Sequence, residues 1–155
     1  FRTHRELIEL MEEKRVEVFF YGLFMDFDIL REHGLVPERW EVARLHGYEF
    51  EIASWGYLRT SDRQCVYGVV VPANERELAK LYDNTSGILT AQYFPEPVLV
   101  ETLEGKWIPA LCYVATSPPE GPVNTKYANA MVKLAEKFKF PAWYVEHLSS
   151  FRNAT

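Results

Sequence analysis

The chain has 155 residues, which is the size of one domain with a single hydrophobic core. Its net charge of −5, with lysine and arginine scattered along the sequence, offers no basic surface for nucleic acid or for an anionic membrane. No apolar run approaches membrane-spanning length and the N-terminus is too charged for a signal peptide, so we expect a cytoplasmic protein.

The first part of the chain predicts a helix, a strand and a second, short helix. Thr3 and Glu6 form a capping-box pattern before an apolar stripe at helical spacing, which indicates a helix over residues 3–14. A β-branched and aromatic run then ends at Tyr21-Gly22, just before the next helical pattern. Such a strand, glycine and helix start can expose backbone N–H groups that hold a carboxylate or a developing oxyanion. Alternatively, the run is a buried strand and Gly22 only permits a tight turn.

The next part reads as extended structure. Residues 38–53 alternate apolar and polar side chains, with a break at Gly47. A short strand at 57–59 is separated by a turn from a nearly continuous apolar strand at 64–71, which we expect to be buried. Gly68 in the middle of this strand predicts a bulge or a close backbone approach.

The remaining elements are a helix, a hairpin and two C-terminal helices. Asn74 starts a capped helix over 74–82, and a dense turn signal follows at 83–87. A β-hairpin is predicted over 97–115 and helices over 124–150. Tyr127 lies on the apolar face of the first C-terminal helix. Five further apolar residues are expected to pack on the sheet and to take no part in chemistry: Met131, Leu134, Phe138, Trp143 and Leu148.

No repeat, linker or low-complexity segment interrupts the chain. The pattern therefore predicts a single α+β domain over residues 1–155, with an N-terminal helix within 1–15. Four histidines lie far apart, and none is near another histidine or a cysteine at ligand spacing, so we expect no metal. Cys65 and Cys112 are expected to be buried free thiols. The sequence lacks a nucleophile elbow for a catalytic serine. It also lacks a glycine-rich phosphate loop for a nucleotide, and we expect no cofactor.

The segment Tyr21-Gly22-Leu23-Phe24-Met25 resembles the Tyr-Gly-Ser-Leu signature of the γ-glutamylcyclotransferase-like proteins. The resemblance covers nearly the whole chain from Val16, although only this first motif is sharp. It continues through Gly47-Tyr48-Glu49-Phe50, Tyr67-Gly68-Val69-Val70-Val71 with the helix after it, Tyr93 with residues 97–100, and residues 124–144. It implies a small mixed β-barrel with surrounding helices.

The resemblance also implies a reaction on a small-molecule γ-glutamyl compound. Members of the family cyclise a γ-glutamyl group to 5-oxoproline and release the attached amine or amino acid. Because the substrate's own α-amine attacks its γ-carbonyl, the protein needs only a carboxylate base and N–H donors for the oxyanion. The resemblance implies substrate contacts at six residues: Tyr21, Gly22, Leu23, Phe24, Ser86 and Tyr93.

The sequence departs from the family pattern at the base. The family's acid precedes a glycine that is best matched by Gly87, and here the preceding residue is Ser86, whose hydroxyl cannot act as that base at neutral pH. The nearest carboxylates are Asp83 and Glu96, which are therefore the candidates for the base. Asp83 can equally be a turn residue at the end of a helix.

Three interpretations follow from this departure. The chain is a cyclotransferase whose base is Asp83 or Glu96, or it is a non-catalytic binding or regulatory domain that kept the loop and lost the acid. The third is a different reaction on a small amide or amine in the same pocket.

Overall fold

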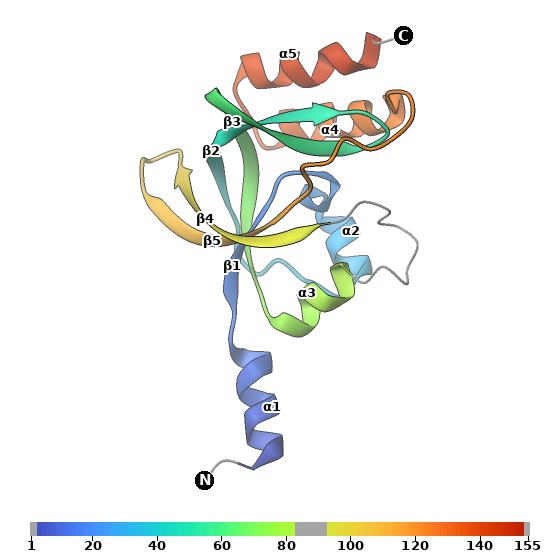
Figure 1. Ribbon diagram of the computed structural model, residues 1–155. Helices are drawn as coiled ribbons and strands as arrows, with labels where there is room; N and C mark the ends of the chain where they lie inside the picture. Colours follow the sequence, from blue (N-terminus) through green and yellow to red (C-terminus); the bar gives the residue numbers. More distant parts are fainter. Residues whose placement is uncertain (1–2, 83–92, 154–155) are drawn as a thin grey trace.

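The computed structural model describes residues 3–82 and 93–153, apart from the side chains of residues 10–13 and 153. Five strands close into a barrel in the order β1-β3-β2-β4-β5 (Figure 1). They are β1 (Val16–Phe20), β2 (Glu41–Ile52), β3 (Gly56–Ala73), β4 (Phe94–Thr102) and β5 (Trp107–Val114). β1 runs parallel to β5, whereas the neighbouring pairs are antiparallel. The predicted α+β fold with a mixed barrel is confirmed.

Helices flank the barrel at both ends. They are α1 (His4–Glu13), α2 (Phe27–Glu32), α3 (Glu75–Leu81), α4 (Thr125–Lys137) and α5 (Ala142–Ser150), with 3₁₀ turns η1 (Leu23–Met25) and η3 (Phe151–Asn153). In Figure 1, α4 and α5 pack together at one end, whereas α1 extends away from the other end. None of the described helices combines the length and the apolar character needed to span a bilayer.

Two capping boxes that the sequence predicts are confirmed. Thr3 Oγ1 accepts a hydrogen bond from the N–H of Glu6 at 3.1 Å, and the Thr3 N–H donates to Glu6 Oε2 at 3.3 Å. Asn74 Oδ1 accepts from the N–H of Glu77 at 2.8 Å, and the Asn74 N–H donates to Glu77 Oε1 at 2.9 Å. These bonds satisfy backbone donors that a helix start leaves free, so local sequence fixes where α1 and α3 begin.

The prediction of two strands separated by a turn was wrong, because β3 is one strand of 18 residues. Its register with β2 shifts at Gly47, whose φ is 92°, and residues 61–64 of β3 lie opposite that single glycine. The Ser61 hydroxyl accepts hydrogen bonds from the N–H groups two and three residues later, at 3.3 and 3.2 Å. The turn-forming residues therefore make a bulge, and pairing with β2 resumes beyond it.

The close backbone approach predicted at Gly68 is confirmed. A Cβ atom at this position would lie 2.3 Å from the carbonyl oxygen of Phe20 and 2.7 Å from Cζ of Phe19. Both neighbours belong to β1, so the absence of a side chain at Gly68 lets the end of β1 lie close against β3, its paired neighbour in the barrel wall.

The C-terminal helices cover the barrel as expected, with one exception. Met131, Leu134, Phe138 and Leu148 are buried. Trp143 is 43% exposed and meets Tyr67 edge-on, with the ring centroids 6.0 Å apart. Trp143 therefore contacts the barrel wall as expected but is covered only in part, because Tyr144 and Leu148 form the inner stripe of α5 and the residue before Tyr144 is rotated away from it.

We expect Leu134→Ala to lower the free energy of unfolding by about 2–5 kcal/mol, because it removes a buried side chain and leaves a cavity. Urea denaturation followed by circular dichroism measures this loss. The side chain does not line the cavity described below, so ligand affinity of the folded variant should be unchanged. A large loss of affinity with unchanged stability would contradict this structural role.

Candidate functional site

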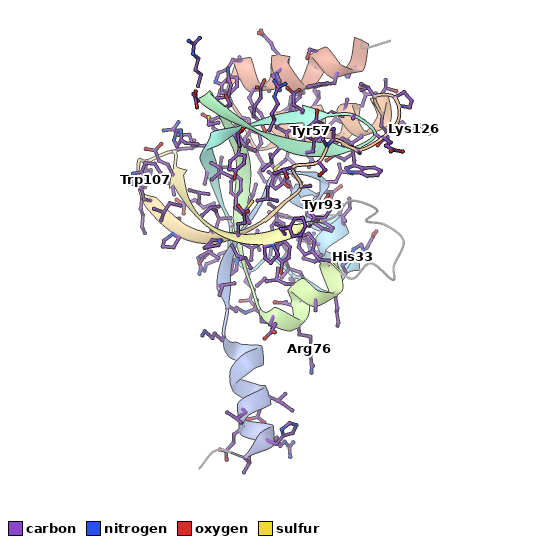
Figure 2. The ribbon with its side chains drawn as sticks, viewed as in Figure 1. His33, Tyr57, Arg76, Tyr93, Trp107 and Lys126 are labelled. Atoms are coloured by element: carbon purple, nitrogen blue, oxygen red, sulfur yellow. The ribbon has the colours of Figure 1, made fainter. Side chains whose placement is uncertain are left out.

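A cavity of about 280 Å³ lies where β1 leads into η1, which is near the lower end of the roughly 300–1,000 Å³ typical of ligand pockets. Its wall combines the end of β1 and the β1–η1 loop, the β2–β3 hairpin and parts of α2, α4 and β5 with residues next to α3 and β4. Figure 2 shows side chains gathered around Tyr93 in this part of the molecule. The lining residues are Phe19, Phe20, Tyr21, Gly22, Leu23, Phe24, Ile29, Ser54, Trp55, Gly56, Tyr82, Tyr93, Tyr113, Asn124 and Tyr127.

The loop after β1 contributes unpaired backbone donors to this wall. The carbonyls of Gly22 and Leu23 accept hydrogen bonds from Met25 and Asp26 at 3.0 and 2.9 Å, which closes η1. Within the described part of the chain, no acceptor bonds to the N–H groups of Gly22, Leu23 and Phe24. The first N–H groups of a helical turn have no partner inside that turn. They are therefore available to an anionic group in the cavity.

Two glycines make room for the hydroxyl of Tyr127. A Cβ atom at Gly22 would lie 3.2 Å from Tyr127 Oη, and one at Gly56 would lie 2.6 Å from the same oxygen and 2.3 Å from Cζ of Phe50. The side chain of Tyr127 thus reaches from the start of α4 between the β1–η1 loop and the β2–β3 hairpin. Burial is the main reason that the pKa of Tyr127 is raised, so its hydroxyl stays protonated and can donate.

Aromatic rings form most of the rest of the wall. Tyr82 and Tyr113 stack with their centroids 3.8 Å apart and an angle of 9° between the rings. The ring centroids of Phe24 and Tyr93 lie 5.5 and 5.6 Å from the ring centroid of Tyr82. The Tyr21 hydroxyl donates to the carbonyl of Tyr113 at 2.8 Å and accepts from the N–H of Ala115 at 3.3 Å. The Tyr21 side chain therefore ties the end of β1 to the end of β5, and its hydroxyl is already engaged.

Five residues expected to contact substrate lie together in the cavity wall: Tyr21, Gly22, Leu23, Phe24 and Tyr93. Asp83 and Ser86 lie outside the described residues. Glu96 is exposed on β4 opposite Cys112 and does not line the cavity. Glu96 pairs with Cys112 across β4 and β5, and burial and then the Glu96 carboxylate raise the pKa of Cys112 to about 12. The prediction that Glu96 is the base gains no support from this position.

The described wall contains no carboxylate and no basic side chain. Its polar groups are neutral. Two of them, Ser54 Oγ and Trp55 Nε1, are buried and have no hydrogen-bond partner among the described residues. A ligand is therefore met by aromatic faces, hydroxyls, an indole N–H and backbone groups.

Sequence reasoning missed the wall residues that come from distant elements. Ser54, Trp55 and Gly56 follow a strand, where they signal only a turn, and Tyr82 and Tyr113 end ordinary amphipathic elements. Tyr127 was read as part of an apolar helix face. Their grouping depends on barrel closure, which brings the hairpin and the start of α4 beside the first loop. The one local signal was the concentration of tyrosine near element ends.

One group outside the cavity has potential metal-ligand atoms. Glu49, Glu51 and His147 place one such atom each within 4.8 Å of the others. Arg59 Nη2 already bridges both carboxylates at 3.1 and 2.8 Å, and His147 Nε2 is 2.6 Å from the carbonyl oxygen of Phe50. The salt bridges join β3 to β2 and the His147 contact joins α5 to β2, and we assign no metal to this group.

Comparison with known proteins agrees with this architecture. Residues 65–148, more than half of the chain, match the AIG2-like family. A solved structure titled gamma-glutamyl cyclotransferase superposes with a TM-score of 0.75 at 23% identity, covering 88% of each chain. An uncharacterized human protein gives a TM-score of 0.72 at 23% identity, covering 89% of this chain and 88% of that one.

A yeast gamma glutamyl cyclotransferase specific to glutathione gives a TM-score of 0.64 at 11% identity, covering 91% of this chain and 96% of that one. No curated protein sequence matches the chain. At these identities the solved structures establish a shared fold. The fold and the family match together lead to one conclusion: the chain belongs to the AIG2-like family.

Proposed function

We propose that the chain binds a γ-glutamyl compound in the cavity and cyclises the γ-glutamyl group to 5-oxoproline. The observation that carries this proposal is the row of N–H groups at Gly22, Leu23 and Phe24, which lack acceptors among the described residues and lie in the cavity wall. The likeness of the fold to solved gamma-glutamyl cyclotransferases supports the choice of substrate.

For this reaction the protein has to supply only a base and hydrogen-bond donors for an oxyanion. The substrate's α-amine attacks its own γ-carbonyl carbon, a new C–N bond closes the five-membered ring, and the bond to the leaving amine breaks. A base takes one proton from the α-ammonium group to free the amine, and the attacking nitrogen loses a second proton as the ring closes; both protons go to the leaving nitrogen, which departs as an ammonium group. The loop N–H groups stabilise the oxyanion that forms at the γ-carbonyl oxygen, which accounts for a site without a protein nucleophile.

Asp83 is the base in this proposal. It follows Tyr82 in the sequence, and the Tyr82 side chain lines the cavity, whereas Glu96 is exposed on β4 outside it. A second candidate function is ligand binding without turnover. It is favoured by one observation, the lack of any carboxylate among the described wall residues, together with Ser86 at the position where the family has its acid.

The assay is release of 5-oxoproline from γ-glutamyl amines and amino acids. We expect weak turnover by the wild type and a loss of about 10²–10⁴-fold in Asp83→Asn, since general-base catalysis contributes about that much. Glu96→Gln is the matched control, because it removes a carboxylate outside the cavity, and it should retain wild-type activity. A wild type that binds γ-glutamyl compounds without turnover would establish the binding domain, and loss in Glu96→Gln alone would contradict the assignment of Asp83.

We expect Gly22→Val to abolish the rise in melting temperature that a γ-glutamyl ligand produces. A Cβ at this position already approaches Tyr127 Oη at 3.2 Å, and the two added methyl groups would block access to the loop N–H groups. Ligand at 100 times its Kd stabilises a folded protein by about 2.7 kcal/mol, so the missing rise is readily measured by differential scanning fluorimetry.

Leu134→Ala serves as the control for this measurement. It should start from a lower melting temperature and keep the full ligand-induced rise. An undiminished rise in Gly22→Val would contradict the placement of the ligand on the loop.

A further inference from the structure

A second cavity opens at the end of the barrel opposite the candidate site. β1 and β5 run parallel, and Phe20 and Tyr113 near their ends line the first cavity. Glu17 and Trp107, near the starts of the same two strands, line the second. Figure 2 shows Trp107 and Tyr93 on opposite sides of the barrel. The second cavity measures about 530 Å³, within the roughly 300–1,000 Å³ of ligand pockets, and shares no lining residue with the first.

Strand alternation places part of the second cavity in the mouth of the barrel. Glu41 and Ile108 lie two residues before Ala43 and Ala110, which are buried on the inner faces of β2 and β5. Val70 pairs with Glu41 across β2 and β3, is 2% exposed and also lines the cavity. The cavity therefore combines an apolar inner end with charged side chains at its rim.

Two tryptophans supply aromatic surface to the second cavity. Trp40 is 51% exposed, and its ring centroid lies 5.9 and 5.3 Å from those of Phe27 and Phe138. Trp107 is 53% exposed, and its ring centroid lies 5.8 Å from that of His46. Each indole is thus supported by another ring and keeps about half of its surface for contact with a ligand. Aromatic walls of this kind are suited to an apolar or aromatic group.

The charged side chains of the second cavity are only partly compensated. Arg39 Nη2 lies 2.5 Å from Glu17 Oε1, so these two charges neutralise each other. Among the described residues, no ion pair involves the carboxylate of Glu41 or the ammonium group of Lys106. The cavity therefore offers one uncompensated charge of each sign beside its aromatic walls. A complementary ligand carries an ammonium group, a carboxylate and an apolar side chain.

We infer that the second cavity binds a free α-amino acid with an aromatic side chain. The ligand's ammonium group pairs with Glu41 and its carboxylate with Lys106. Its ring packs against the indoles of Trp40 and Trp107, which removes apolar surface from water. A ligand with a charge of one sign only would leave one of the two side chains uncompensated and would face its own sign on the other. This inference concerns a separate site and does not depend on the proposed function.

The probe is L-phenylalanine, titrated into the full chain and followed through the indole N–H resonances in two-dimensional ¹H–¹⁵N NMR. We expect saturable shifts at Trp40 and Trp107, which line the second cavity, and none at Trp55 or Trp143, which do not. 2-Phenylethylamine lacks the carboxylate and 3-phenylpropionate lacks the ammonium group. Each should bind about fivefold more weakly than L-phenylalanine, the factor expected for one lost ion pair near a protein surface.

Two variants assign the charges. Lys106→Gln should abolish the advantage of L-phenylalanine over 2-phenylethylamine and keep its advantage over 3-phenylpropionate, and Glu41→Gln should do the reverse. The matched control is Glu104→Gln, which removes an exposed charge from the β4–β5 turn outside the cavity and should bind like the wild type. All three side chains are exposed, so the variants should fold normally.

Four results would overturn the inference. Equal binding of 2-phenylethylamine and L-phenylalanine would make the cavity a site for cations. A shift at Trp55 alone would place the amino acid in the first cavity. Shifts of Trp40 and Trp107 that depend on protein concentration without ligand would show that a second copy of the chain covers the cavity. No shift at millimolar L-phenylalanine would show that the cavity is not a site for amino acids.

Discussion

In the Asp83→Asn background, replacing Ser86 by glutamate is expected to raise the rate of 5-oxoproline release by about 10²–10⁴-fold, the usual contribution of a general base. Ser86 precedes Gly87, the glycine that best matches the one after the acid in γ-glutamylcyclotransferase-like proteins. The wild-type serine cannot take a proton from the substrate ammonium at neutral pH. A carboxylate at this position would supply the base to a cavity that already has the N–H groups of Gly22, Leu23 and Phe24.

The control for this experiment is Ser86→Gln, which has the size of glutamate without its charge. It should show no gain. Steady-state assays across pH should show the added activity of Ser86→Glu rising as its carboxyl group ionises. If Ser86→Glu in the Asp83→Asn background binds γ-glutamyl amides as tightly as Asp83→Asn alone but is no faster, the assignment of Ser86 to the position of the acid is contradicted.

Replacing Gly68 by alanine is expected to lower the free energy of unfolding by more than about 3 kcal/mol, beyond the usual range for overpacked cores. Much of the protein should then be unfolded. The added Cβ would lie 2.3 Å from the carbonyl oxygen of Phe20. That oxygen belongs to the backbone of β1, which cannot move away without separating the paired strands β1 and β3. Urea denaturation monitored by circular dichroism measures the loss.

Gly105→Ala separates this clash from the conformational effect of losing a glycine. Gly105 has a φ of 86°, and no atom lies within 4 Å of the position that its Cβ would take. An alanine held in this left-handed conformation should lower the free energy of unfolding by about 1–2 kcal/mol, which is less than the loss expected at Gly68. If the two variants lose the same stability, the close approach of β1 to Gly68 is not what limits substitution there.

Much of the fold could be predicted because its signals are local. The capping boxes at Thr3 and Asn74, the hairpin turn at Gly105 and the apolar strand around Gly68 each depend on a few neighbouring residues. The bulge at 61–64 could not be distinguished from a turn. Both use the same polar residues, and only the pairing of β2 beyond Gly47 shows that the strand continues.

The candidate site likewise has one part that local sequence predicts and another part that depends on the closed barrel. The loop at Tyr21 to Phe24 could be predicted because a strand, a glycine and a helix start are adjacent in the sequence. Tyr127 and Trp55 could not, because they lie beside the loop only after the barrel closes and α4 packs on it. Glu96 illustrates the opposite error: it is near Tyr93 in the sequence, but exposed on β4 away from the cavity. Glu96 shares its face of β4 with the buried Val100 and Thr102, so its exposure comes from its place near the start of the strand.

Two-dimensional ¹H–¹⁵N NMR titration with γ-glutamyl-isopentylamide tests most directly whether the cavity binds a γ-glutamyl group. The amide resonances of Gly22, Leu23 and Phe24 should shift saturably, together with those of Gly56 and the indole N–H of Trp55, since these groups surround the cavity. Shifts confined to the surface groove around Trp40 and Trp107, or no shifts at millimolar ligand, would contradict the account.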